Sequence, residues 1–345
     1  MPKINFFHNF ELFKKHLNFV GSAEQPKRLD IVKLAKEKAK NSNLITSYEI
    51  EDSKFNDEYK EYLNKIHPAK HIQEIANSEK NITSLYPLQA FTQTFATAIK
   101  DSQISFYAMR PPGHHSFAGG ISKDDDFDGG YQVGEGFCYF NNVVFATLLA
   151  NIKHHKKSVL IVDWDYHHGN GTQATLFDIK NDSITTKFKD FDTYFISLHN
   201  ATIYPYKEDP DKEPNNYATI SGKANNSNSY VKNIHTSKKD YIDEIFLPKF
   251  YNAIDEAFAK MTPDLIFISA GFDARNGDPI AKFVDGEGLS DEAYYKMANY
   301  IKNKQQTYNK IAPIVSLLEG GYNVTESGFS EAVYQHLKGL HEGQL

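Results

Sequence analysis

The chain has 345 residues, of which 40% are hydrophobic and 14% aromatic, and this composition excludes an intrinsically disordered protein. Its formal net charge of −6 provides no bulk attraction for nucleic acid or an anionic membrane, and a single cysteine, Cys138, excludes an internal disulfide framework. The polar start at Met1–Phe10 lacks the apolar core of a signal peptide and no apolar run is long enough to span a bilayer, so we expect a soluble, cytoplasmic protein.

Short apolar runs alternate along the chain with helical patterns. The helical patterns cover Asn142–Ile152 and Asp240–Lys260, the second with a clear apolar stripe. This alternation predicts an α/β fold with a mainly parallel central sheet and helices on both faces. The expected strands, in chain order, are Ile104–Met109, Val159–Val162, Tyr194–Leu198, Leu265–Ser269 and Ile314–Leu318.

No internal repeat or low-complexity linker divides the chain, so we expect one domain over residues 1–345. Three long polar segments, 119–135, 178–192 and 207–228, are expected to be loops. Long loops of this kind serve either as rims of a site or as surface that tolerates insertions.

Side chains capable of acid–base or metal chemistry follow the expected strands. Because the carboxyl ends of parallel strands meet at one edge of a sheet, we expect these side chains to gather in one cleft. A lone histidine pair or a lone Gly-Gly-Tyr turn is more often structural, but their shared placement after strands indicates an active site. The residues are His114 and His115 after the first strand, Asp163, Asp165, His167 and Asn170 after the second, Asp273 after the fourth and Tyr322 after the fifth.

Asp165 and His167 stand two residues apart in the stretch Val162–Gly171. In an extended chain their side chains leave the same face, where a carboxylate oxygen and an imidazole nitrogen can hold one divalent transition metal. With Asp273 they form a three-ligand set that leaves room for water, which is typical of a catalytic metal site. Zn²⁺ is the expected ion, and the set also tolerates Fe²⁺ or Co²⁺. A polar turn that caps a helix is the structural alternative for this stretch.

With these motifs in place, the chain resembles the zinc-dependent histone deacetylases of the arginase–deacetylase fold, and in particular their class II branch and bacterial relatives. The resemblance spans most of the chain and implies that fold, with the active site at the carboxyl ends of the strands. It rests on an ordered set of segments, which are Pro26–Arg28, Ile66–Ile72, Arg110–His115, Gly136–Asn142, Val162–Gln173, Ile196–His199, Gly271–Ala274 with Gly277–Pro279, and Leu318–Asn323.

The resemblance implies a role for each catalytic residue. Zn²⁺ would be bound by the three ligands named above. Of the tandem histidines, His114 would stay protonated beside Asp163, and His115, beside Asn170, would act as the general base. Asn170 occupies the place where class I members have Asp. The hydroxyl of Tyr322 would help to polarise the substrate carbonyl.

The resemblance also implies binding sites around this centre. Gly136 and Phe137 would form one wall of a tunnel for the acyl-lysine side chain, and Tyr204 the other. Arg28 would lie near an internal channel for acetate release. A structural K⁺ would be held beneath the zinc by main-chain oxygens of Asp163, Asp165 and His167 together with Ser197 and Leu198.

The expected reaction is therefore zinc-dependent hydrolysis of acetyl-lysine, or another acyl-lysine, in proteins or peptides, with release of acetate. Ile280 lies where acetylpolyamine-specific relatives are expected to carry glutamate, and an apolar residue there favours lysine. The acidic loop 119–135 is compatible with a basic protein tail or with a polyamine. An acetylpolyamine or other small-molecule deacetylase and a non-catalytic acyl-lysine binding module are the alternatives. We expect no direct binding of nucleic acid or membrane, and the acyl length, the target and the oligomeric state stay open.

Overall fold

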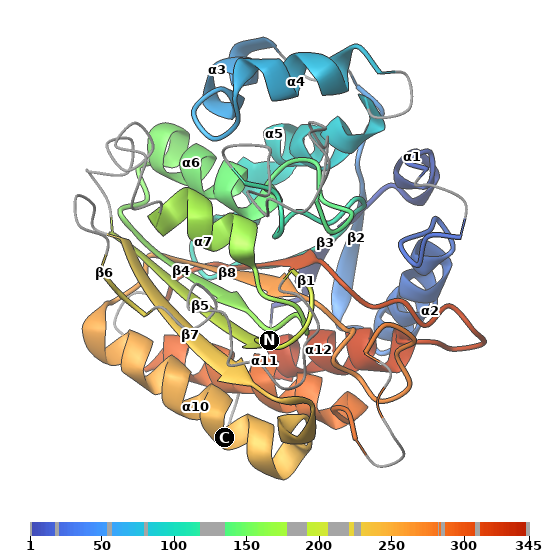
Figure 1. Ribbon diagram of the computed structural model, residues 1–345, viewed down its shortest axis with the longest axis vertical. Helices are drawn as coiled ribbons and strands as arrows, with labels where there is room; N and C mark the ends of the chain where they lie inside the picture. Colours follow the sequence, from blue (N-terminus) through green and yellow to red (C-terminus); the bar gives the residue numbers. More distant parts are fainter. Residues whose placement is uncertain are drawn as a thin grey trace.

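Nine strands form one open sheet in the part of the chain that the computed structural model describes (Figure 1). The described residues are 2–17, 21–53, 57–78, 82–117, 135–177, 192–205, 221–223, 229–281, 283, 287–307 and 311–342. The strand order is β2-β1-β3-β9-β8-β4-β5-β7-β6, and every pair is parallel except β6 with β7. The strands are β1 Ile4–His8, β2 Ile45–Glu49, β3 Ile104–Ala108, β4 Ser158–Asp163, β5 Asp192–Asn200, β6 Gly222–Lys223, β7 Ser229–Thr236, β8 Leu265–Ala270 and β9 Ile314–Leu318.

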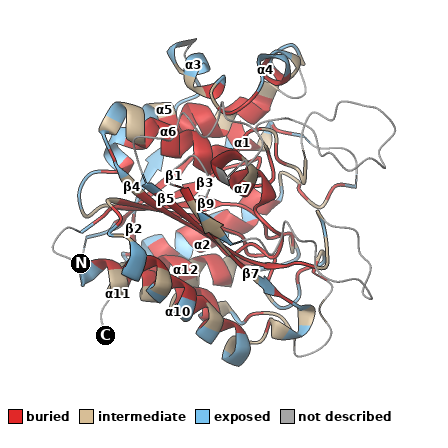
Figure 2. Ribbon diagram, turned by 60° about the vertical axis from the view of Figure 1, so that its left-hand side comes forward, coloured by how far each residue is buried: buried red, intermediate tan, exposed pale blue. Residues whose placement is uncertain are grey.

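The sheet confirms the predicted α/β architecture. The five expected strands are β3, β4, β5, β8 and β9, and they occupy adjacent central positions in the sheet. Their side chains are buried along almost their whole length, because helices cover both faces of a parallel sheet (Figure 2). The sequence analysis did not identify β1, a buried strand within the polar start of the chain.

The helices form two layers, one on each face of the sheet. Helices α5, α6 and α7 lie on one face, and α10, α11 and α12 lie on the other (Figures 1 and 2). The α-helices are α1 Phe10–Lys14, α2 Arg28–Asn41, α3 Lys60–Leu63, α4 Ala69–Ala76, α5 Tyr86–Ala98, α6 Asn142–His154, α7 Asn170–Phe177, α10 Asp243–Lys260, α11 Asp291–Gln306 and α12 Ser330–Glu342. Short 3₁₀ helices cover Asp57–Tyr59, Ile82–Leu85 and Lys238–Asp240.

Local capping sets the ends of the two predicted helices. The Asn141 side chain accepts a hydrogen bond from the Val144 N–H and begins α6, and His155 ends it in the left-handed conformation at φ 55°. The predicted helix from Asp240 begins instead at Asp243, because Ser237 and Asp240 cap a separate 3₁₀ turn.

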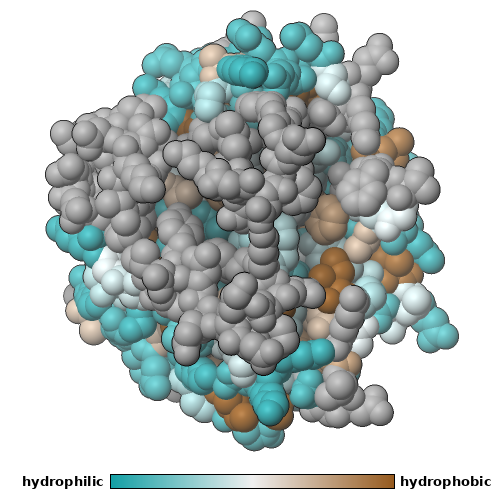
Figure 3. Space-filling model, in the orientation of Figure 1, coloured by the Kyte–Doolittle hydropathy of each residue, from teal (hydrophilic) through white to brown (hydrophobic). Residues whose placement is uncertain are grey.

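The surface that is described is mainly polar in the view of Figure 3, where hydrophilic side chains gather over α3 and α4. Among the described residues, no helix combines the length and the apolar character needed to cross a membrane. The three segments predicted as loops, 119–135, 178–192 and 207–228, lie almost entirely outside the described residues.

Candidate functional site

The predicted reactive residues meet at the carboxyl ends of four strands that are consecutive in the sheet, β3, β9, β8 and β4. His114 and His115 follow β3, and Tyr322 follows β9. Asp273 follows β8, and the stretch 163–170 runs from the end of β4 into the start of α7. Parallel neighbours place these four ends side by side, so residues as far apart in the chain as His114 and Tyr322 share one site.

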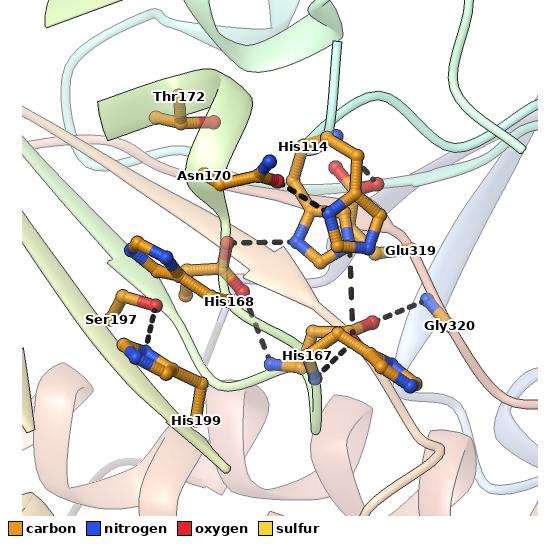
Figure 4. Close-up of polar contacts among 12 residues, drawn as sticks. His114, His167, His168, Asn170, Thr172, Ser197, His199, Glu319 and Gly320 are labelled. Atoms are coloured by element: carbon orange, nitrogen blue, oxygen red, sulfur yellow. Dashed lines mark hydrogen bonds and ion pairs between the residues drawn. The ribbon is translucent and has the colours of Figure 1, made fainter. Parts of the chain in front are cut away.

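Asp165, His167 and Asp273 lie together in this site, and all three are buried. The Nδ1 atom of His167 is 2.8 Å from Oδ2 of Asp273 and 3.2 Å from Oδ1 of Asp165. One ligand atom of each residue lies within 4.8 Å of the others. Backbone N–H groups orient the carboxylates. Gly320 donates to Asp165 Oδ2 at 2.9 Å (Figure 4), and Tyr166 donates to Asp273 Oδ1 at 3.1 Å.

The three residues fit a divalent transition metal by their donor chemistry and by the space around them. Two carboxylates and one imidazole are a common ligand set for such ions. Two glycines let the backbone approach the carboxylates closely. A Cβ atom at Gly271 would lie 2.2 Å from Asp165 Oδ2, and one at Gly320 would lie 2.5 Å from the same oxygen. A larger residue at either position would displace a ligand.

Electrostatic coupling within this group is strong. Burial and the neighbouring charge of Asp165 raise the pKa of Asp273 to about 6. Burial also opposes ionisation of Asp165, but His114 and His167 outweigh it and lower the pKa of that carboxyl. Burial lowers the pKa of His167, yet the two carboxylates outweigh burial and raise it to about 10. The group thus has a negative potential that favours a cation.

A second group with metal-ligand atoms in mutual reach contains His114, Cys138 and Glu319. Burial raises the pKa of the Cys138 thiol well above its usual range, and it raises the pKa of Glu319 to about 7. Metal binding needs a thiolate and a carboxylate. The first group, which contains two carboxylates and one imidazole and no buried thiol, fits a divalent transition metal better.

The tandem histidines have opposite charge preferences although their rings are only 4.1 Å apart. His114 donates from Nδ1 to Asp163 Oδ2 at 3.0 Å. Burial opposes its charge, but the nearby carboxylates Asp165 and Asp163 raise the pKa of His114 to about 10. His115 donates from Nδ1 to the neutral amide oxygen of Asn170 at 2.7 Å. Burial, and then the charge of His114, hold the pKa of His115 well below its usual value. A charged and a neutral imidazole therefore stand side by side.

Tyr322 is held from three sides. Its backbone N–H donates to Asp278 Oδ2 at 2.7 Å, and its ring centroid is 5.7 Å from that of Phe137. The guanidinium carbon of Arg28 is 4.7 Å from the Tyr322 ring centroid. Gly321 precedes it at φ 114°, a conformation that favours glycine. The hydroxyl is thus presented from a fixed ring.

Two of the residues predicted to line a tunnel, Gly136 and Tyr204, contact the His115 ring. Gly136, at φ 50°, contacts the ring so closely that a Cβ atom there would lie 2.2 Å from His115 Cδ2. The Tyr204 ring stands edge-on to His115 with centroids 5.1 Å apart, and Tyr204 precedes a cis proline. Ile280 is half-buried, and its N–H donates to Asp278 Oδ1 at 2.9 Å. The acidic segment expected beside this wall, apart from Glu135, lies outside the described residues.

The residues predicted for a K⁺ site are buried on or after strands β4 and β5. The Ser197 hydroxyl shares a hydrogen bond of 2.9 Å with His199 Nδ1. His168 stacks on His199 with 4.0 Å between the ring centroids (Figure 4), and it donates to Gln173 at 2.7 Å. These contacts give His168 a packing role, and the K⁺ site stays a prediction.

Sequence reasoning gave no role to three buried acids that support the site. Glu319 Oε2 accepts from the Gly113 N–H at 2.7 Å, and Asp278 binds the Tyr322 N–H as described above. Glu24 accepts from Arg28 Nη1 at 2.9 Å and from Arg110 Nη2 at 2.5 Å. The first two follow strand ends and could have been found by the rule used for Asp273. Glu24 gave no such signal, because its partner Arg110 is 86 residues away.

Comparisons with known proteins point to one family. The family model described as "Histone deacetylase domain" matches residues 22–340. "Histone deacetylase 6" of Caenorhabditis elegans is 28% identical over 313 residues, which are 89% of this chain and 28% of that protein. "Histone deacetylase clr3" of Schizosaccharomyces pombe is 31% identical over 296 residues, which are 79% of this chain and 36% of that protein. This chain thus spans about a third or less of either relative.

A solved structure shows the same fold. The chain titled "Crystal Structure of HDA15 HD domain" superposes with a TM-score of 0.71, covers 99% of this chain and 90% of its own length, and is 22% identical in sequence. At 22% sequence identity, this structural similarity establishes the fold alone.

Gly136→Ala is expected to destabilise the protein through its contact with His115. The new Cβ atom would meet a buried ring, and overpacking of this kind costs about 1–3 kcal/mol. Gly21→Ala is the matched control, because Gly21 also has a positive φ, of 85°, but has no atom within 4 Å of a built Cβ. Urea unfolding of both variants would measure the difference. Equal losses of unfolding free energy would contradict the close contact.

Proposed function

This chain belongs to the histone deacetylase family, and we propose on that premise that it hydrolyses the amide bond of Nε-acetyl-lysine in proteins or peptides and releases acetate. One observation carries the proposal. A neutral, buried imidazole, that of His115, stands beside the three-residue group Asp165, His167 and Asp273, with its ring 6.0 Å from that of His167. Amide hydrolysis needs a base at such a position.

Asp165, His167 and Asp273 would hold one catalytic Zn²⁺. When bound, this ion would polarise the substrate carbonyl and lower the pKa of water. The carboxylates are already oriented by backbone N–H groups, so little rearrangement is needed to receive it. A structural K⁺ on the main-chain oxygens around Ser197 and Leu198 belongs to the same proposal.

The two histidines and Tyr322 would divide the proton chemistry. His115 carries its proton on Nδ1, so Nε2 is free to take a proton from the attacking water. The same nitrogen then returns that proton to the leaving lysine amine. His114, protonated beside Asp163, supplies positive potential. The Tyr322 hydroxyl donates to the carbonyl oxygen as negative charge develops there, a contribution of about 3 kcal/mol.

The aromatic walls support a long apolar side chain as the substrate arm. Phe137 and Tyr204 would enclose the methylene groups of lysine, and Ile280 adds no charge that would select a polyamine. A non-catalytic acyl-lysine binding module would need neither the neutral His115 nor the rigidly held Tyr322. We therefore propose an enzyme acting on acyl-lysine, and its setting in the cytoplasm is part of the proposal.

Metal-stripped protein is expected to bind one Zn²⁺ per chain and to gain thermal stability, because an ion that binds only the folded state stabilises it by about 2.7 kcal/mol at a hundred times its Kd. Asp273→Asn removes one charged ligand and should lose most of both effects. Metal content after dialysis and calorimetric Tm would be measured, with the surface variant Asp255→Asn as control. Full zinc binding by Asp273→Asn would contradict the assigned ligands.

Tyr322→Phe is expected to lower kcat at least tenfold, because the hydroxyl that donates to the developing oxyanion is removed. Zinc content and KM for an acetyl-lysine peptide should change little. The comparison variant is Tyr334→Phe, which removes a half-buried tyrosine hydroxyl of α12 that shares a hydrogen bond of 3.2 Å with Ser42. If Tyr322→Phe turned over peptide as fast as the unaltered protein, the proposed role would be wrong.

The kcat/KM of the enzyme should be higher for an acetyl-lysine peptide than for N-acetylputrescine. Ile280→Glu is expected to shift the ratio of the two kcat/KM values at least tenfold towards the amine, because a carboxylate attracts its distal ammonium group. Ile280→Leu is the control. A preference of the unaltered protein for N-acetylputrescine would overturn the assignment of acyl-lysine as substrate.

A further inference from the structure

Glu135 is a carboxylate at the site for which the mechanism above has no role. It stands directly before Gly136, the residue that contacts the His115 ring. Two backbone hydrogen bonds fix its position, since Glu135 N–H donates to Cys138 O at 2.8 Å and Cys138 N–H donates to Glu135 O at 2.7 Å. Cys138 is buried, so this small bridge is anchored in the protein interior.

The Glu135 side chain is linked to His115 through Asn170. The amide nitrogen of Asn170 donates to Glu135 Oε1 at 3.3 Å, and the amide oxygen of Asn170 accepts from His115 Nδ1 at 2.7 Å. Asn170 and His115 are both buried, and Glu135 is half-buried. The result is a hydrogen-bonded chain from the imidazole through the amide to a carboxylate.

This series of hydrogen bonds, from imidazole through amide to carboxylate, fixes the direction of each bond in it. An amide side chain has one accepting end and one donating end, and an ionised carboxylate can only accept. The NH₂ end of Asn170 must therefore face Glu135, and its oxygen must face His115. That oxygen requires a proton on Nδ1 of His115, which leaves the lone pair on Nε2. A reversed amide would donate to Nδ1, and the proton would move to Nε2, where the base must be free.

Among the described residues, Glu135 is the one hydrogen-bond acceptor recorded for the Asn170 NH₂ group. The backbone N–H of Asn170 donates to His168 O at 2.7 Å. That contact holds the backbone at the start of α7 and leaves both amide orientations open. The side-chain orientation therefore depends on Glu135.

Tyr204 brings a second link between Glu135 and His115. Its ring stands edge-on to the His115 ring. Burial raises the pKa of the Tyr204 hydroxyl, and the neighbouring charge of Glu135 raises it further.

We infer that Glu135 is a positioning residue for His115, because it orients the Asn170 amide so that Nδ1 of His115 carries the proton and Nε2 is free to accept one. This inference rests on the proposed hydrolase function, in which His115 is the base.

The first test compares two substitutions in zinc-loaded protein with an acetyl-lysine peptide. Glu135→Gln keeps an oxygen that can accept from Asn170, so kcat should stay within about threefold of the unaltered protein. Glu135→Leu removes the acceptor, and kcat should fall at least tenfold with little change in KM. Equal losses of kcat in both variants would show that the charge of residue 135 matters and the orientation of the Asn170 amide does not, which overturns the inference. A rise in KM alone would assign Glu135 to substrate binding and overturn it too.

A double substitution makes the test specific to the Asn170 link. In Asn170→Asp the carboxylate accepts from His115 Nδ1 in either orientation, so the acceptor at residue 135 is no longer needed. Adding Glu135→Leu to that background should leave kcat unchanged or raise it, because a like charge is removed. A tenfold loss in the double variant would mean that Glu135 acts by another route, and the inference would fail.

A measurement without substrate separates this inference from the proposed function. Nitrogen-15 NMR of labelled histidines reports which ring nitrogen carries a proton, and His115→Phe identifies the signal of interest among 14 histidines. His115 should carry its proton on Nδ1 in the unaltered protein and in Glu135→Gln, but at least partly on Nε2 in Glu135→Leu. An unchanged signal in Glu135→Leu would overturn the inference. Absence of turnover by the unaltered protein would instead remove the proposed function, and the tautomer result would still stand.

Discussion

Two buried carboxylates, Asp165 and Asp273, must be held within a few ångströms of each other at a place shielded from water, and much of the surrounding structure compensates for their repulsion. Burial raises the free energy of each ionised carboxylate, and the nearby charge of the other carboxylate raises it further. Backbone N–H groups from Gly320 and Tyr166 donate to them, and His167 lies between them. Glycine at 271 and 320 is a consequence of this constraint, because a side chain there would occupy the space of a carboxylate oxygen.

The backbone that supplies one of these N–H groups is itself fixed by a buried ion cluster. Arg28 donates from Nε to Gly321 O at 2.6 Å and from Nη2 to Glu319 O, the carbonyls on either side of Gly320. Arg28 is held in turn by Glu24, which also binds Arg110. A continuous path thus runs from Glu24 to the carboxylate of Asp165. Removal of Glu24 would leave two buried guanidinium groups without their common partner, an arrangement far costlier than loss of a surface ion pair.

The sequence predicts those parts of this arrangement that depend on local pattern. Apolar runs of β-branched residues identify the central strands, and the period of two along a strand places Asp165 and His167 on one face. Hydrogen-bond and ion-pair partners that are far apart in the chain give no local sequence pattern. Glu24 and Arg110 are separated by 86 residues, and Glu135 and Asn170 by 35. Their pairing arises only when the sheet and its connections are formed, so the support of the site is less predictable than its reactive groups.

His114 and His115 show why such support decides chemistry. They are the same residue type, adjacent in the chain and equally buried, and their rings are in contact. The carboxylates of Asp165 and Asp163 outweigh burial and raise the pKa of His114, whereas burial and the charge of His114 lower the pKa of His115, whose Nδ1 has only an amide partner. A carboxylate stabilises the imidazolium, whereas an amide fixes the ring without stabilising its charge. A base that must release its proton again to a leaving amine benefits from the second arrangement. The amide, however, can face either way, and a carboxylate placed behind it removes that ambiguity without bringing a charge into contact with the ring.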